Sequence, residues 1–160
     1  MRRSLMAAVF LAVTAGTLTP ARAQSTGFTA RLSGQEQVPV VSTAATGLAV
    51  FQLNADQTRL FYRLEVQNIQ NVLMAHIHIA PTGQNGPVAV WLYPPSPPPV
   101  LIPGLSSGIL QTGTITAANL VGPLQGRDMG ALIGALRAGN AYVNVHTSQF
   151  PGGEIRGQIR

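Results

Sequence analysis

Alternation of apolar and polar residues runs through most of the chain after residue 27 and predicts β-strands. In a strand, side chains two residues apart lie on the same face. The segment 60–67 is the clearest example, and it pairs as a hairpin with 47–54 across turn-forming residues 54–57. On the same grounds, strands are predicted at 28–33, 47–54, 60–67, 75–79, 88–93, 107–116, 141–147 and 154–159.

A different period predicts one short helix between residues 128 and 139. Asp128 can cap its first turn, and Gly139 can end it. Short strands punctuated by glycine and proline, with one helix, predict an all-β antiparallel sandwich or barrel. The proline-rich run 94–99 is interpreted as a stiff surface connection between two halves of the fold. The apolar face of the helix, spaced i, i+3, i+4 and i+7, consists of Met129, Leu132, Ile133 and Leu136.

The first 23 residues differ from the rest and predict a secretory signal peptide. Arg2 and Arg3 are followed by an apolar stretch at 5–18 and by the sequence Ala21-Arg22-Ala23, which is typical of a cleavage site. We therefore expect a single mature domain at 24–160, periplasmic or extracellular, with no membrane anchor after cleavage. The paired arginines also leave a twin-arginine export route open, although general secretion is the default interpretation.

Composition narrows the function classes. The chain has no cysteine, which excludes disulfides, a thiol nucleophile and zinc–thiolate sites. Three of its ten basic residues lie in 1–23, which leaves seven arginines against five acidic residues and a net charge of +2. These arginines form no cluster, so no nucleic-acid partner is predicted. With 46% hydrophobic residues, the domain can fill a core.

Histidines supply the sharpest chemical signal. His76 and His78 lie two apart on a predicted strand and share a face with Met74, and His146, the third histidine of the chain, lies in another strand. Imidazole is a ligand for copper and zinc, so these three residues are the candidate metal site, with copper or zinc as the expected cofactor. The residues expected to support the site, as further ligands or as orienting groups, are Glu154, Tyr142 and Asn144.

Other interpretations of these residues stay open. The histidines can instead pack between sheets and donate hydrogen bonds to the backbone. Trp91, Tyr93 and Phe150 could form a contact patch for an unknown protein or glycan partner, although the single tryptophan is interpreted as a core residue. A hydrolase is the least supported interpretation. Ser148 lies near His146 in the sequence, but the chain has no G-x-S-x-G motif.

Four segments resemble the CHRD domain, a module first described in chordin and found in many exported bacterial proteins. The resemblance implies a Greek-key-like β-sandwich of immunoglobulin-like shape, and it implies no specific activity. Chordin itself binds bone morphogenetic proteins, but similarity of fold does not transfer that partner. The segments that carry the resemblance are 28–39, 76–78, 137–147 and 151–159.

The pair His76-x-His78, a distant third histidine and a glycine-rich C-terminal strand are also similar to the copper half of Cu,Zn superoxide dismutases. A bridging histidine, a zinc loop and cysteines are missing, which argues against a two-metal dismutase and leaves a copper half-site. We therefore interpret the chain as an exported binding module with a three-histidine metal site, rather than an enzyme. The alternative is a copper-dependent redox protein.

Overall fold

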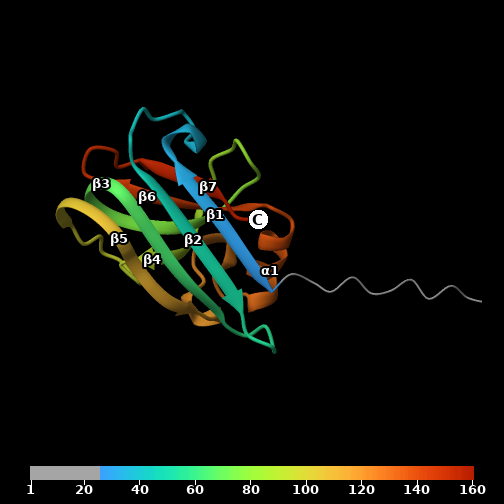
Figure 1. Cartoon of the computed structure of the whole chain (residues 1–160). Helices are drawn as coiled ribbons and strands as arrows, with labels where there is room; N and C mark the ends of the chain where they lie inside the picture. Colours follow the sequence, from blue (N-terminus) through green and yellow to red (C-terminus); the bar gives the residue numbers. More distant parts are fainter. Residues whose placement is uncertain (1–25) are drawn as a thin grey trace, which may run out of the picture.

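The structure, a computed structural model, describes residues 26–160 and is built mainly of antiparallel strands (Figure 1). The predicted leader at 1–23 lies outside the described residues. Within 26–160, no helix is long and apolar enough to span a membrane. The strands are β1 (Gly27–Ser33), β2 (Thr46–Leu53), β3 (Leu60–Ile79), β4 (Val88–Tyr93), β5 (Ile102–Ile115), β6 (Ala141–Thr147) and β7 (Ile155–Gln158).

The predicted helix is confirmed as α1 (Met129–Arg137). The Asp128 side chain accepts a hydrogen bond from the backbone N–H of Ala131 at 3.2 Å, as expected of an N-cap. All four residues of the predicted apolar face are buried, and Gly139 follows the helix with a φ of 67°. Three short 3₁₀ helices were not predicted, namely η1 (Gly34–Glu36), η2 (Ala117–Asn119) and η3 (Gly122–Leu124).

The two strands predicted at 60–67 and 75–79 are in fact parts of one strand of 20 residues, β3. The link between them was missed because it lacks steady alternation. It holds Asn68 and Asn71 at φ values of 54° and 55°, and the pairing register shifts on both sides of it. Residues 60–67 of β3 pair with β2 and residues 60–72 pair with β5, whereas residues 72–79 pair with β6 and residues 75–78 pair with β4.

These pairings make the sheet close on itself. β1 pairs with β2, β2 with β3, β3 with β6, β6 with β7, and β7 again with β1. The predicted antiparallel, mostly β fold with one helix is confirmed, in a barrel-like arrangement. The finer prediction of a Greek-key-like sandwich is not confirmed. The proline-rich run 94–99 connects β4 to β5, which pair with different segments of β3.

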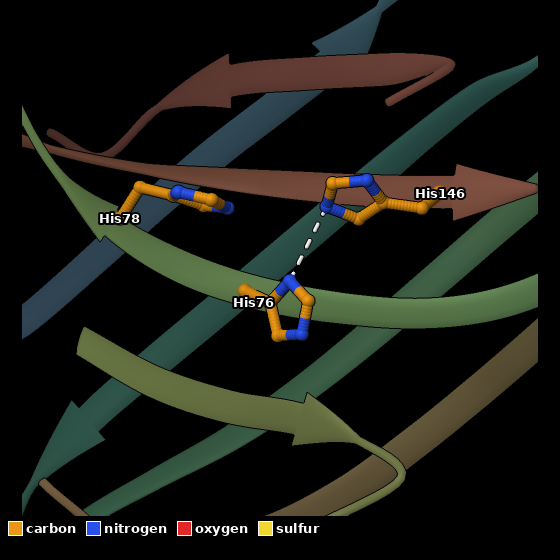
Figure 2. Close-up of side chains that lie close together, drawn as sticks. All are labelled: His76, His78 and His146. Carbon is orange, nitrogen blue, oxygen red and sulfur yellow. Dashed lines mark hydrogen bonds between the residues drawn. The ribbon is translucent and has the colours of Figure 1, made fainter. Parts of the chain in front are cut away.

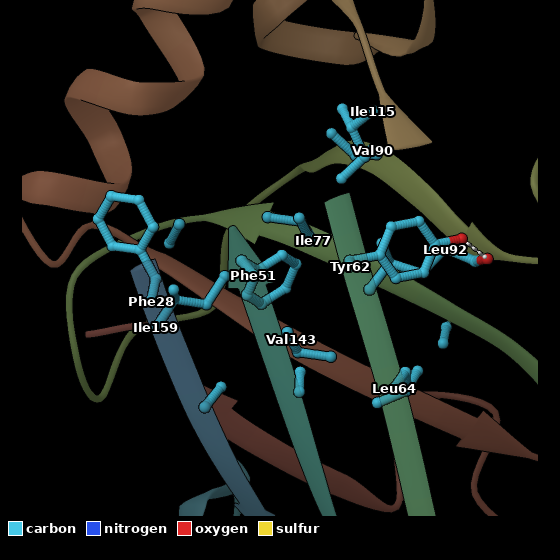
Figure 3. Close-up of a cluster of buried hydrophobic side chains, with 14 of the residues drawn as sticks. Phe28, Phe51, Tyr62, Leu64, Ile77, Val90, Leu92, Ile115, Val143 and Ile159 are labelled. Atoms are coloured by element: carbon cyan, nitrogen blue, oxygen red, sulfur yellow. Dashed lines mark hydrogen bonds between the residues drawn. The ribbon is translucent and has the colours of Figure 1, made fainter. Parts of the chain in front are cut away.

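The hydrophobic core fills the inside of this closed sheet (Figure 3). Tyr62 enters it from β3, and its hydroxyl donates a hydrogen bond of 2.7 Å to the backbone carbonyl of Leu92. The other face of β6 is also covered, because all seven residues of that strand are buried. β7 is likewise buried on both faces, and Arg156 is only 2% exposed. A second buried layer, rich in polar side chains, therefore lies outside the core.

Gly157 is predicted to be intolerant of a side chain, because β7 passes close to β1 at this point. A methyl group there would overlap the backbone carbonyl of Arg31, which cannot move without disturbing the sheet. Gly157→Ala is expected to lower the free energy of unfolding by about 3 kcal/mol, measured by urea denaturation. Gly134→Ala is the control, since this exposed helix position has open space around it and should gain about 0.5–1 kcal/mol. Equal stabilities for the two variants would contradict the close approach.

Candidate metal centre

The pairing of β3 with β6 brings the three histidines together (Figure 2). His76 and His78 alternate on one face of β3. His76 lies opposite Asn144, and His146 lies opposite Met74, so His146 projects from the same face of the sheet. One ring nitrogen from each histidine can be chosen such that all three atoms lie within 4.8 Å of one another. Residues 70 positions apart in the sequence thus share one cluster.

Backbone carbonyls determine which nitrogen of each ring carries the proton. His78 Nδ1 lies 2.9 Å from the carbonyl oxygen of Gly86, and His146 Nδ1 lies 2.9 Å from that of Pro151. A carbonyl oxygen only accepts, so both Nδ1 atoms must donate, and both Nε2 atoms carry a lone pair. His146 Nε2 then accepts a hydrogen bond of 3.2 Å from His76 Nδ1. Consequently His76 also presents its lone pair on Nε2.

Two of these lone pairs have no protein partner. His76 Nε2 and His78 Nε2 are buried without a hydrogen bond from any described residue of the chain. Leaving a buried acceptor unsatisfied costs about 1–3 kcal/mol. Orienting Nδ1 through a carbonyl while Nε2 stays available is the usual arrangement around a metal-binding imidazole. The pattern therefore suits a ligand that accepts electron pairs, such as a metal cation.

The histidines are held in their neutral, metal-binding form. Burial, followed by the proximity of His146 and His78, lowers the pKa of His76 to about 3. Burial also lowers the pKa of His78 to about 4, against the opposing effect of its hydrogen bond to Gly86. The pKa of His146 is lowered by burial as well. None of the three rings needs to lose a proton before it binds a cation near pH 7.

Aromatic rings surround the cluster. The rings of Trp91 and His76 meet edge to face, with ring centres 4.3 Å apart. Trp91 is half-buried beside the histidines. The interpretation of Trp91 as a core residue is therefore wrong, because β4 turns this position towards the histidine face. On the other side, Tyr142 stacks on His78 with ring centres 4.8 Å apart and planes at 7°. The Tyr142 hydroxyl accepts the N–H of Gly86, the residue whose carbonyl holds His78.

The remaining candidate residues lie at the border of the cluster. The Asn144 side chain accepts a hydrogen bond of 2.7 Å from buried Gln37 and donates to the carbonyl of Gly152. Both oxygens of Glu154 accept from threonines, one from Thr43 at 2.7 Å and the other from Thr147 at 2.8 Å. Glu154 is not part of the cluster of potential ligand atoms. Its position next to β6 fits a structural role at the edge of the site.

Comparison with known families identifies the family of the chain. The family model of the CHRD domain matches residues 28–159. The chain belongs to the CHRD domain family. Searches of curated proteins and of solved structures found no significant match. In this CHRD domain the histidine cluster lies entirely within the matched region.

The histidine cluster of this CHRD domain fits a small metal ion. Ligand bonds of about 2.0–2.1 Å place the nitrogens of a tetrahedral site about 3.4 Å apart. The observed limit of 4.8 Å exceeds this separation by about 1.4 Å, so the rings would have to draw closer together around an ion. His78 and His146 would bind through Nε2. His76 presents Nδ1 to His146, whereas its unpartnered Nε2 lies on the far side of the ring (Figure 2).

Several contributors to this CHRD site were not predicted from the sequence. The carbonyls of Gly86 and Pro151 orient two of the rings, and a backbone carbonyl leaves no trace in side-chain patterns. Trp91 and Arg156 were also missed as neighbours of the site. Arg156 Cζ lies 3.5 Å from the centre of the Tyr142 ring. The alternation of residues 154–159 had identified Arg156 only as a polar residue of the last strand. The turn-forming pair Asn85-Gly86 was the one available signal, because it marks where the chain returns towards His78.

Proposed function

We propose that this CHRD domain is an exported metal-binding module that holds one copper or zinc ion through His76, His78 and His146. The observation that carries the proposal is the cluster of three buried imidazoles, each with one ring nitrogen within 4.8 Å of the other two. Neutral imidazoles with oriented Nδ1–H groups are the ligands that copper and zinc use in proteins. Export is supported by the sequence pattern of residues 1–23.

Binding is favoured over catalysis because the site is closed. His76, His78 and His146 are exposed by only 2%, 7% and 5%. A catalytic metal needs an open position for substrate or water. The alternative, a copper-dependent redox protein with a half-site like that of superoxide dismutase, would require a channel to a buried ion. Storage or delivery of a metal ion requires only that the surrounding loops open transiently.

A protein partner is a second part of the proposal, supported by apolar side chains on the outer face of β2, β3 and β5. Val50, Phe61 and Ile109 are exposed by 42%, 45% and 57%. Val50 lies opposite Arg63, and Ile109 lies opposite Glu65, so these side chains flank the Arg63–Glu65 ion pair. Apolar side chains around a polar pair suit contact with another protein, whose interfaces combine apolar and polar groups.

Metal content of the mature protein tests the proposed function directly. We expect the untagged 24–160 chain, purified from the periplasm of an expression host, to carry or take up close to one equivalent of copper or zinc. Elemental analysis after gel filtration gives the ratio. A chain that remains metal-free after incubation with excess copper and zinc would refute the proposal. The histidines would then be structural, as packing residues with backbone hydrogen bonds.

A further inference from the structure

A fourth residue with a potential donor atom, Met74, lies beside His146 in the sheet. Met74 is the direct cross-strand partner of His146 and precedes His76 by two residues, so it shares their face of β3. Its side chain is half-buried. Side chains directly opposite each other on paired strands have Cβ atoms about 4.5–5.5 Å apart, which places a flexible thioether within reach of an ion held by His146.

The charge around the site is the second observation. The three histidines and Met74 are uncharged, and the buried carboxylate of Glu154, at the edge of the site, accepts hydrogen bonds from two threonines. A charged group ends the stack of rings that begins at His78. Tyr142 stacks on His78, and the buried guanidinium of Arg156 lies over the ring of Tyr142. Arg156 donates to Asn85 and to the carbonyl of Gln84, and within residues 26–160 no carboxylate forms a salt bridge with it.

A buried cation already present beside a neutral ligand set disfavours a second highly charged ion. The cost of burying an ion rises steeply with its charge, and repulsion from a fixed cation is stronger in a low-dielectric interior. Exposed Glu36 is the carboxylate that acts on Arg156 electrostatically, and it lies at the surface. On its side of the cluster, Arg156 therefore favours a monovalent ion over a divalent one.

We propose that the site is selective for copper(I), with the Met74 sulfur as a fourth donor beside the three imidazoles. This inference rests on the proposed metal-binding function and names its ion. Thioether sulfur is a soft donor that favours copper(I), whereas zinc gains little from it. Imidazole nitrogens complete a neutral, compact ligand set, and Trp91 shields the His76 side of the site.

The test compares copper(I) and zinc affinities of the mature protein with those of Met74→Leu, a substitution that keeps size and apolarity. Copper(I) is titrated anaerobically against the chromophoric chelator bicinchoninate, and zinc is titrated against a fluorescent zinc chelator. Met74→Leu is expected to weaken copper(I) binding by about 10–100-fold and to change zinc binding less than about threefold. Met129→Leu, in the core face of α1, is the matched control and should change neither affinity.

Each outcome decides the proposal. Copper(I) affinity unchanged in Met74→Leu would overturn the role of Met74, and copper that gives a copper(II) paramagnetic resonance signal in air would overturn selectivity for the monovalent ion. Zinc bound in preference to copper(I) from an equimolar mixture would overturn the selectivity while leaving the proposed metal-binding function intact. Failure to bind either ion would overturn both. If Met74→Leu has a lower melting temperature and loses copper(I) affinity but keeps its zinc affinity, the proposal is still supported, because zinc binding shows that the site is folded.

Discussion

Replacing His146 with alanine is expected to reduce the affinity for copper or zinc by more than about 100-fold, since even residues that only orient a metal ligand change affinity by about 10–100-fold. His146 faces the other two histidines from β6, with its ring centre 5.0 Å from that of His76 and 6.0 Å from that of His78. Its Nε2 is the acceptor that His76 Nδ1 now contacts. Two ligands on a single strand cannot enclose an ion without a third from β6.

Titration of each ion into wild-type and His146→Ala protein measures this loss. Trp91 is the only tryptophan of the chain and lies against His76, so its fluorescence should report copper entering the site. Gln67→Ala, an exposed position on the same strand as His76, serves as the control and should retain full affinity. An affinity within threefold of the wild-type value in His146→Ala would show that the ion binds elsewhere.

The metal-free protein is expected to lose about 4 kcal/mol of stability between pH 7 and pH 5, about 2 kcal/mol from each of His76 and His78. In the unfolded chain a histidine takes up its proton near pH 6.5. In the folded protein burial lowers the pKa of His76 to about 3 and that of His78 to about 4. Below pH 6.5 the unfolded state therefore binds protons that the folded state cannot, and stability falls as the pH falls.

His146 adds to this loss in the same direction, because burial lowers its pKa as well. The expected loss is a large fraction of the about 5–15 kcal/mol by which a typical domain is stable. Urea denaturation at pH 7, 6 and 5 in the presence of a chelator measures it, in a range where most carboxylates stay ionised. A variant with glutamine at all three positions should show a flat profile. Equal wild-type stability at pH 7 and pH 5 would mean that the rings are protonated in the folded state.

Local sequence patterns determined the elements of this protein well. Alternation located the strands, and the i, i+3, i+4, i+7 spacing located α1 with all four buried residues. The same period of two placed His76 and His78 on one face, and Tyr142 and Asn144 on the face of His146. These predictions succeeded because side-chain direction within one element follows from backbone geometry alone.

The prediction failed where contacts between distant segments decide the outcome. Alternation presented Arg156 as one of the polar residues of the last strand, whereas the turn 80–87 covers it and supplies its hydrogen-bond partners. The continuity of β3 through Asn68 and Asn71 was also missed, because positive φ values and bulges interrupt the alternation without ending the strand. Trp91 was assigned to the core because a single tryptophan in a small domain is usually buried, whereas the pairing of β3 with β4 sets it opposite His76.

The sequence by itself determined that this protein is a mostly β domain with two histidines side by side and a third elsewhere. The tertiary structure decided that the third joins them, through the register that sets Met74 opposite His146 and His76 opposite Asn144. It also decided which ring nitrogens are free, through the carbonyls of Gly86 and Pro151. Strand register and backbone hydrogen bonds arise when the sheet closes and many weak local preferences are satisfied together, so no single segment encodes them.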